Sequence, residues 1–265
     1  MKKSLLVALG LSMVLALTAC GKTQEEPKAE ENVEATQDTT DASAEDTADV
    51  AEDTADVADE AEADDSIMSY ADYVAAELDS EVKVECYVQA TQSWWEDAIT
   101  VYAADEDGAY FIYNMACSEE DAAKLVEGTK IVVTGYKSEW SGEVEIVDGT
   151  FESDFSTGYV ATATDATALL GTDELADYMN QKVSFTDMTV TAVSYKNNEP
   201  GDDIYVNLEK DGVEYYFCLE YYLNGSDADF YELVGNLQEG QVVDVEAFLY
   251  WYEGPNPHLT AVTVK

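Results

Sequence analysis

Arginine is absent from the 265 residues, and the chain has a single histidine, His258. Arginine is the side chain that most often contacts phosphates and base edges, and nucleic-acid affinity depends on cationic groups that displace counterions. Twelve lysines stand against 57 acidic residues, which gives a formal net charge of −45. Because a chain of this charge repels polyanions, we expect no binding to nucleic acid.

The scarcity of histidine and cysteine also limits the chemistry that this chain can perform. Zinc sites need several histidine or cysteine ligands, and the sequence has no Cys-x-x-Cys pair. His258 follows a Pro-Asn-Pro run that predicts a turn, and no Gly-x-Ser-x-Gly motif is present. Acid pairs suffice for glycosidases, but 57 acids make such pairs uninformative. We therefore predict a non-enzyme with no metal and no cofactor.

The start of the chain carries the most specific signal. Two lysines precede an apolar run over residues 5–17, which is too short to span a bilayer, and Cys20 follows in the sequence Leu-Thr-Ala-Cys. This layout resembles the signal of a bacterial lipoprotein, in which the lipobox cysteine receives diacylglycerol. The resemblance implies that residues 1–19 are a signal peptide and that Cys20 is the lipidation site, with palmitate-type chains. An ordinary secretory peptide cut near Ala19 is the alternative.

The lipid would decide where the protein is located. Each buried methylene contributes about 0.8 kcal/mol, and stable anchoring takes roughly two acyl chains, which a diacylglyceryl group on Cys20 supplies. The resemblance therefore implies attachment to the extracellular face of the cell membrane, with a Gram-positive surface favoured. The implied partners are the membrane, through the lipid anchor, and an unknown extracellular ligand or envelope protein.

Residues 20–66 predict a disordered acidic tether that starts at the lipidated cysteine. From residue 24 to residue 66 there are 18 acids, one lysine and no aromatic side chain, so the segment cannot bury enough apolar area to offset its ordering entropy. A heptapeptide repeats at 44–50 and 51–57. A coiled coil is disfavoured because each repeat offers one valine and only negative charges.

Residues 67–265 have a net charge of −31 and contain the same order of signals twice. The first copy predicts a helix over 70–78, a strand over 82–88, a strand and acidic turn over 100–108, a strand over 110–113, a helix capped by Ser118, and strands over 131–136 and 143–147. The second copy predicts a helix over 173–179, a strand over 183–188, a strand and turn over 204–212, a strand over 215–217, a helix capped by Ser226, and strands over 242–248 and 259–264.

Five strands with a helix between the third and fourth strand is the plan of the OB-fold. We predict a mainly β fold with short helices, in which two tandem five-stranded OB-fold-like barrels follow the tether. The first module is residues 67–151 and the second module is residues 169–265, joined by a linker over 152–168. The region is similar to the tandem OB-fold-like regions of secreted lipoproteins of gut Firmicutes, a group mostly without assigned function. A single large β-sandwich is the competing architecture.

Two of the three cysteines beyond Cys20 could form a bridge. Cys86 lies at an inward-facing position of a predicted strand, and Cys117 ends another strand. A Cys86–Cys117 disulfide suits an oxidising exterior, while buried free thiols are the alternative.

An OB barrel usually binds across its second and third strands, between the loops that join strands 1–2 and 4–5. Aromatic rings cluster in or near those loops, where they could stack on sugar faces or on peptide side chains. The candidate ligand-binding residues are Trp94, Trp95, Trp140, Tyr250, Trp251 and Tyr252. The alternative is that these rings cap the barrel ends or form the interface between the modules.

The sequence therefore predicts a cell-surface lipoprotein that acts as a non-catalytic binding or adaptor module for a glycan or peptide. A structural or partner-docking subunit of an envelope complex is the alternative. A surface hydrolase is the weakest hypothesis, because it needs an acid pair that converges in a cleft. The sequence does not identify the ligand or the oligomeric state, and does not decide whether the modules share one site.

Overall fold

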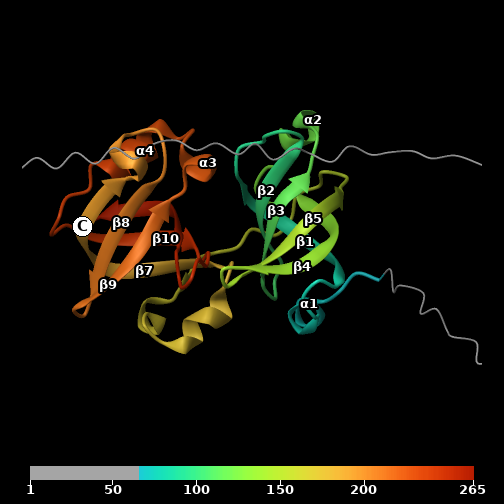
Figure 1. Ribbon diagram of the computed structural model, residues 1–265, viewed down its shortest axis with the longest axis horizontal. Coiled ribbons are helices and arrows are strands. Elements are labelled where there is room, and N and C mark those ends of the chain that lie inside the picture. The colour runs from blue at the N-terminus through green and yellow to red at the C-terminus, as the bar shows by residue number, and fades with distance from the viewer. Residues whose placement is uncertain (1–65) are drawn as a thin grey trace, which may run out of the picture. The chain divides into compact units, whose positions relative to one another are not determined.

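The computed structural model describes residues 66–265, and the fold is mainly β with a few short helices (Figure 1). The predicted signal peptide, the lipidation site Cys20 and the tether as far as residue 65 lie outside the described residues. Between residues 66 and 265 the structure has no helix that combines the length and the apolar character needed to cross a membrane.

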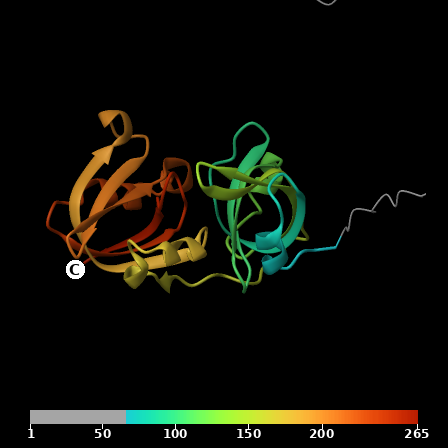
Figure 2. The ribbon, with the colours of Figure 1, turned by 60° about the horizontal axis from the view of Figure 1, so that its bottom comes forward.

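The first module is a closed barrel with the strand order β1-β2-β3-β5-β4 (Figures 1 and 2). Its strands are β1 (Glu81–Thr91), β2 (Ala98–Ala104), β3 (Ala109–Ala116), β4 (Lys130–Trp140) and β5 (Glu143–Glu152). Residues 81–87 of β1 pair with residues 130–136 of β4, and parallel pairing of β3 with β5 closes the barrel. Helix α2 (Glu119–Ala122) stands between β3 and β4. The predicted OB-fold-like barrel is therefore confirmed for this module.

Both helices of the first module begin at serine caps, as predicted for the one at Ser118. Ser69 accepts a hydrogen bond from the Asp72 backbone N–H at the start of α1 (Tyr70–Ala75), and Ser118 accepts one from Asp121 at the start of α2. The other end of α1 is held by Lys137, whose Nζ donates to the carbonyl oxygens of Tyr73, Val74 and Ala76 at 2.8–3.0 Å. A buried lysine thus satisfies carbonyls that a helix end leaves unpaired.

Alternating apolar positions fill the barrel, as in β1, where Val82, Val84, Cys86 and Val88 are all buried. A register shift interrupts the pairing of β4 with β5 at Gly135. A Cβ atom at Gly135 would lie 2.7 Å from Ile146 Cγ2 and 2.8 Å from the Val147 carbonyl oxygen. Glycine is required there because any side chain would push the two strands apart.

The second module is a six-stranded sheet in the order β10-β11-β9-β8-β7-β6, with an additional pairing between β10 and β7. Its strands are β6 (Thr164–Asp165), β7 (Lys182–Tyr195), β8 (Ile204–Lys210), β9 (Val213–Leu219), β10 (Val242–Phe248) and β11 (His258–Val264). The short β6 lies within the predicted linker and pairs in parallel with β7. Apolar side chains such as Phe185 and Phe217 form a core of their own on this sheet, separate from the core of the first barrel.

Two helix predictions for the second module need correction. The segment Asp173–Tyr178, predicted as an α-helix, is a 3₁₀ helix (η2), and Thr172 makes no side-chain cap. Helix α4 (Ala228–Gly235) is capped by Asp227 instead of Ser226: the Asp227 carboxylate accepts from the Phe230 N–H at 3.0 Å. A carboxylate also interacts favourably with the positive end of the helix dipole, which a hydroxyl does not do as strongly. The remaining short helices are η1 (Thr167–Leu169), η3 (Lys196–Asn198) and α3 (Tyr221–Asn224).

The three cysteines of the described region, Cys86, Cys117 and Cys218, are buried free thiols, so Cys86 and Cys117 are not bridged. Burial raises the pKa of Cys117 to about 11, and it raises the pKa values of Cys86 and Cys218 further. Because the thiolate is the reactive form, these protonated cysteines are unreactive and contribute to packing.

The two modules belong to one compact unit of the chain and meet in a small aromatic cluster of their own. Tyr102 from β2 stacks on Phe248 from β10, with ring centroids 4.6 Å apart and planes 21° apart. The Tyr102 hydroxyl forms a 2.7 Å hydrogen bond with His258 Nδ1, and Ser93 bonds to the Tyr222 carbonyl oxygen through its N–H and hydroxyl. We call this contact region the module seam.

A second part of the module seam contains a carboxyl group that is removed from water. Glu143 at the start of β5 is fully buried, and its Oε2 accepts a 2.7 Å hydrogen bond from the Trp251 backbone N–H. Its Oε1 has no hydrogen-bond partner, and neither has Oδ1 of the buried Asn180. Burial raises the pKa of Glu143 to about 8, because the neighbouring Asn180 amide and the Trp251 N–H only partly offset the loss of water.

Glu143 should make the protein less stable as the pH rises. An acid whose pKa is higher in the folded state stabilises the fold below its ordinary pKa of 4.5, and this contribution is lost as the pH rises towards 8. Glu143→Gln removes the ionisation and keeps an acceptor for Trp251. We expect the free energy of unfolding in urea to fall less for the variant than for the wild type between pH 5 and pH 9, with a difference on the order of a few kcal/mol.

Glu152→Gln is the matched control, because Glu152 is an exposed residue at the other end of the same strand. The explanation is wrong if the two variants show the same pH dependence of the free energy of unfolding.

Candidate functional site: a cleft between the modules

A cavity of about 360 Å³ opens where the two modules face each other. It is lined from the first module by Gln92, Phe111, Tyr113, Trp140 and Glu145, and from the second module by Glu220, Tyr250 and His258. The first-module residues come from the position directly after β1, from β3, from the end of β4 and from β5. We call this cavity the inter-module cleft.

Strand geometry explains the wall that the first module contributes. Phe111 and Tyr113 are two residues apart on β3, so their side chains leave the sheet on the same side. Glu145 is the partner of Phe111 in the parallel pairing of β3 with β5, which brings its carboxyl to the same face. Phe111 is buried, whereas Tyr113 is 47% exposed and Trp140, at the β4–β5 turn, is 53% exposed. The wall thus presents aromatic surface that the protein leaves uncovered.

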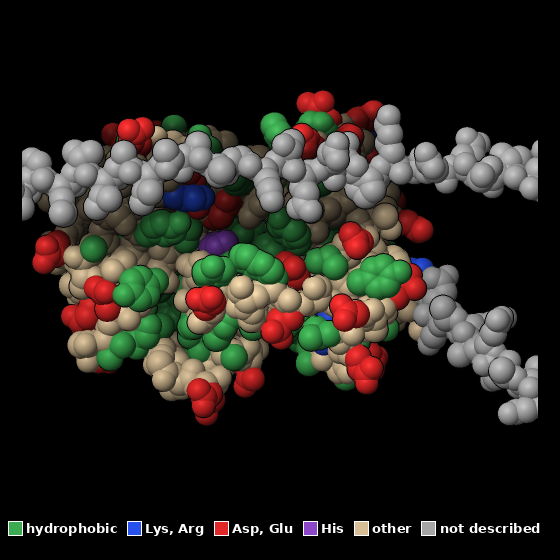
Figure 3. All heavy atoms as spheres, viewed as in Figure 1, with side chains coloured by type: hydrophobic (Ala, Val, Ile, Leu, Met, Phe, Trp, Pro, Cys, Tyr) green, Lys and Arg blue, Asp and Glu red, His purple; other side chains and the backbone are tan. Residues whose placement is uncertain are grey.

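The second-module wall consists of rings that pack on one another and on Phe111. Tyr250 stacks on His258, with centroids 4.4 Å apart and planes 24° apart, and meets the Phe111 ring edge-on at 5.1 Å. His258 is the first residue of β11 and is buried, so the prediction that it lies in a turn is wrong. Figure 3 shows the only histidine of the chain in a hollow among hydrophobic side chains.

His258 is neutral and has a defined tautomer. Burial lowers its pKa to about 3, and burial also raises the pKa of Tyr102, so both groups are uncharged near neutrality. Gln92 Nε2 donates to the Tyr102 oxygen at 3.4 Å, which directs the hydroxyl proton of Tyr102 towards His258 Nδ1. We therefore assign the proton of the imidazole to Nε2.

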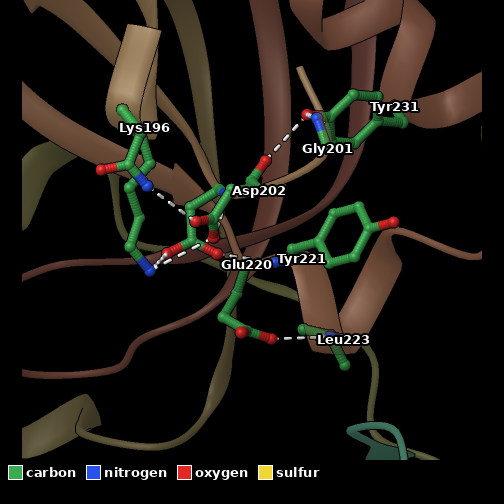
Figure 4. A network of polar contacts seen from close by, with 9 residues as sticks. Lys196, Gly201, Asp202, Glu220, Tyr221, Leu223 and Tyr231 are labelled. Atoms are coloured by element: carbon green, nitrogen blue, oxygen red, sulfur yellow. Dashed lines mark hydrogen bonds and ion pairs between the residues drawn. The ribbon is translucent and has the colours of Figure 1, made fainter. Parts of the chain in front are cut away.

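Glu220 contributes a carboxyl that caps a helix. Its Oε2 accepts a 2.6 Å hydrogen bond from the Leu223 N–H and thereby caps α3. Figure 4 shows this side chain directed at Leu223, while the nearby Lys196 is paired with Asp202 at 3.2 Å and with Asp203 at 3.0 Å. Burial raises the pKa of Glu220 to about 7, so the group titrates near physiological pH.

Glu145 is the second acid of the cleft. It is 6% exposed, and burial raises its pKa. Among residues 66–265, those that line the cleft include no lysine and no arginine. The cleft therefore combines aromatic walls, a neutral imidazole and two carboxyls whose negative charge increases with pH.

Some of the predicted site residues meet at this place and others do not. Trp140 and Tyr250 line the cleft, and the half-exposed Tyr252 lies beside Trp140 with ring centroids 5.2 Å apart. Trp251 is half-buried in the module seam, where its backbone N–H is bonded to Glu143. The two alternatives stated for these rings, a ligand site and a module interface, therefore coincide in space.

Trp94 and Trp95 are not among the residues that line the cleft. Trp94 packs on the core of the first barrel, and its Nε1 donates to the Cys117 carbonyl oxygen at 2.8 Å. Trp95 is 72% exposed. Sequence reasoning missed Phe111 and Tyr113, although their alternation on the third strand of an OB plan was a usable signal. It had no signal for Glu220, which reaches the cleft only through the docking of the modules.

No protein-family model matches the chain, and no curated protein sequence is similar to it. Solved structures do match. A murine DNA-binding protein bound to double-stranded DNA is 11% identical, with 69% of this chain and 94% of that chain covered and a TM-score of 0.34. The Ifi202 HINa domain in complex with 20-bp double-stranded DNA is 10% identical, covering 70% and 98%, with a TM-score of 0.32. The p202 HIN1 domain in complex with a 12-mer double-stranded DNA is 12% identical, covering 72% and 94%, with a TM-score of 0.32.

These structures contradict the prediction of no nucleic-acid partner, and that exclusion is withdrawn. The prediction relied on the net charge of the whole chain, but binding depends on the field at one face of the molecule, which a net charge does not describe. Identities and TM-scores this low identify no ligand of this chain. The similarity of the chain to these DNA-bound proteins is limited to the identities and TM-scores given above.

Proposed function

We propose that the chain is a surface lipoprotein that acts as a non-catalytic binding or adaptor protein, and that the inter-module cleft is its site for a glycan or peptide. The observation that carries the proposal is the composition of the cleft. Partly exposed aromatic rings and a few polar groups converge there from both modules, on the face that OB barrels commonly use. Tyr113 and Trp140 offer the flat surfaces on which sugars and peptide side chains stack.

The proposal includes a second OB-fold-like barrel in the second module. Its pairings run β7-β8-β9-β11-β10 and return from β10 to β7, which is the strand order of the first module. Helix α4 stands between β9 and β10, as α2 stands between β3 and β4. The parallel pairing between β9 and β11 is short and consists of the residue pair Cys218–His258. Duplication thus supports two barrels, which share one site.

The docking of the modules is part of the proposed site. Glu220, Tyr250 and His258 come from the second module, and each is held by contacts at or near the module seam. Without the second module, the face formed by β3 and β5 would be an open surface and not a cleft. The seam therefore builds the pocket and holds the barrels together with the same residues.

A surface hydrolase is the second candidate, because Glu145 and Glu220 line the same cleft. Glycosidases work with two carboxyls, one of which has a raised pKa, and Glu220 has a pKa of about 7. The helix-capping bond of Glu220 to Leu223 gives this carboxyl a structural role, which favours the non-catalytic proposal.

Tryptophan substitutions test the binding site directly. We expect Trp140→Ala to weaken binding of a glycan or peptide from a screening panel at least tenfold in isothermal titration calorimetry. Trp95→Ala should leave affinity unchanged, because Trp95 is a highly exposed tryptophan that does not line the cleft. An equal loss in both variants would refute the cleft as the site.

Incubation of the same ligands with the protein tests the hydrolase. We expect mass spectrometry to find the ligands intact after long incubation. Product formation that Glu145→Gln and Glu220→Gln both abolish would instead establish catalysis.

The lipid anchor can be tested by changing one residue. In the host envelope we expect the wild-type protein to start at Cys20 and to carry acyl groups detectable by mass spectrometry of its N-terminal peptide. Cys20→Ser should move the protein from the membrane fraction to the soluble fraction, because the two acyl chains are lost. Recovery of unacylated wild-type protein from the cytoplasm would contradict the proposed location.

A further inference from the structure

We propose that the group recognised in the inter-module cleft is an ammonium group, either the primary amine of a lysine side chain or amino sugar, or a quaternary amine. This inference rests on the proposed function, since it specifies the ligand of the same site. In this inference the carboxyls of Glu145 and Glu220 attract the positive charge of the ligand, and the aromatic rings contact the faces of the ligand.

The charges in the cleft have one sign. Glu145 and Glu220 are its acids, His258 is neutral, and within the described residues no lysine lines it. Lys196, the lysine nearest to Glu220 in the polar network of Figure 4, is already shared by Asp202 and Asp203. An anion would therefore meet uncompensated repulsion, whereas a monovalent cation would be attracted by the acids and offset part of their charge.

The aromatic rings favour an organic cation over a metal ion. Divalent cations such as Ca²⁺ take six to eight oxygen ligands, and the cleft offers two carboxyls among rings. An alkylammonium group is attracted to the face of a tryptophan or tyrosine ring within about 6 Å of its centre. Trp140 and Tyr113 are half-exposed at the cleft, and Tyr250, which stacks on His258, also lines it. The walls thus suit a cation that carries apolar substituents.

Proton binding should compete with the ligand in this site. Protonation of Glu220 removes a negative charge that the ammonium group needs, so affinity should fall as the pH decreases through about 7. The titratable or charged groups that lie near Glu220 or line the cleft with it are Lys196, Asp202, Asp203, Cys218, Tyr102, Tyr113, Tyr250, Glu145 and His258. Of these, burial raises the pKa of Glu220 to about 7, and burial also raises the pKa of Glu145.

Two probes of the same shape that differ only in charge show whether the positive charge contributes to binding. Choline and its neutral isostere 3,3-dimethylbutan-1-ol are titrated into the full chain by isothermal titration calorimetry at pH 8. We expect choline to bind at least tenfold more tightly than the alcohol and to lose about tenfold in affinity at pH 5.5. Equal affinity for the two probes would overturn the inference.

Substitutions of the two cleft acids test whether choline binds in the inter-module cleft. Glu145→Gln and Glu220→Gln should each lower the affinity for choline at least tenfold, while Glu239→Gln, an exposed acid outside the cleft lining, should not. Glu220→Gln keeps an acceptor for the Leu223 N–H, and thermal unfolding verifies that both variants are folded. Unchanged choline affinity in both folded variants would also overturn the inference.

A lysine-containing peptide and a glucosamine oligomer distinguish the two sources of a primary amine, each compared with its N-acetylated form. Loss of binding on acetylation supports the inference. Binding of a neutral glycan or peptide that Trp140→Ala weakens, without any binding of amines, overturns the inference and leaves the proposed function standing. The absence of binding for every probe contradicts both.

Discussion

The contact of Tyr102 with His258 and Phe248 is the constraint on which the rest of the site depends. It joins a strand of the first barrel to two strands of the second module through ring stacking and a 2.7 Å hydrogen bond. A hydroxyl that donates to Nδ1 needs an unprotonated nitrogen there, and burial keeps the imidazole neutral by lowering the pKa of His258 to about 3. Because Tyr250 in turn stacks on His258, the orientation of the cleft wall follows from the same buried contact.

This arrangement also buries polar groups away from water. Glu143 is fully buried with one oxygen unpaired, and Asn180 also leaves an oxygen unpaired at the same seam. A buried polar atom without a partner costs free energy, so the seam is less stable than an apolar one of equal size. These polar groups also orient the chain: Glu143 binds the backbone N–H of Trp251, whose neighbour Tyr250 lines the cleft and whose neighbour Tyr252 packs beside Trp140.

The strand plan of the first barrel was predictable because its signals are local. Alternating apolar residues, an Asp-Gly turn and serine caps each act within a few residues, and they predict the order of β1 to β5 and the starts of both helices, although α1 ends at Ala75 and not at residue 78. Where two local signals compete, the prediction was wrong: Asp227 caps α4 one residue after the expected Ser226. The Thr172 segment failed for a different reason, since a six-residue 3₁₀ turn packed by Leu175 needs no hydroxyl cap.

By itself the sequence determined the alternation that makes strands, the order that makes an OB barrel, the negative charge, and the aromatic residues near the module ends. Only the tertiary structure decided which of those rings face one another, because Trp94 turns into a core while Trp140 and Tyr250 meet across a seam. It also decided that Glu145 and Glu220, 75 positions apart in the chain, share one cleft. Burial, and with it the protonation of Glu220 and His258, arises from the docking of two modules, which no local pattern encodes.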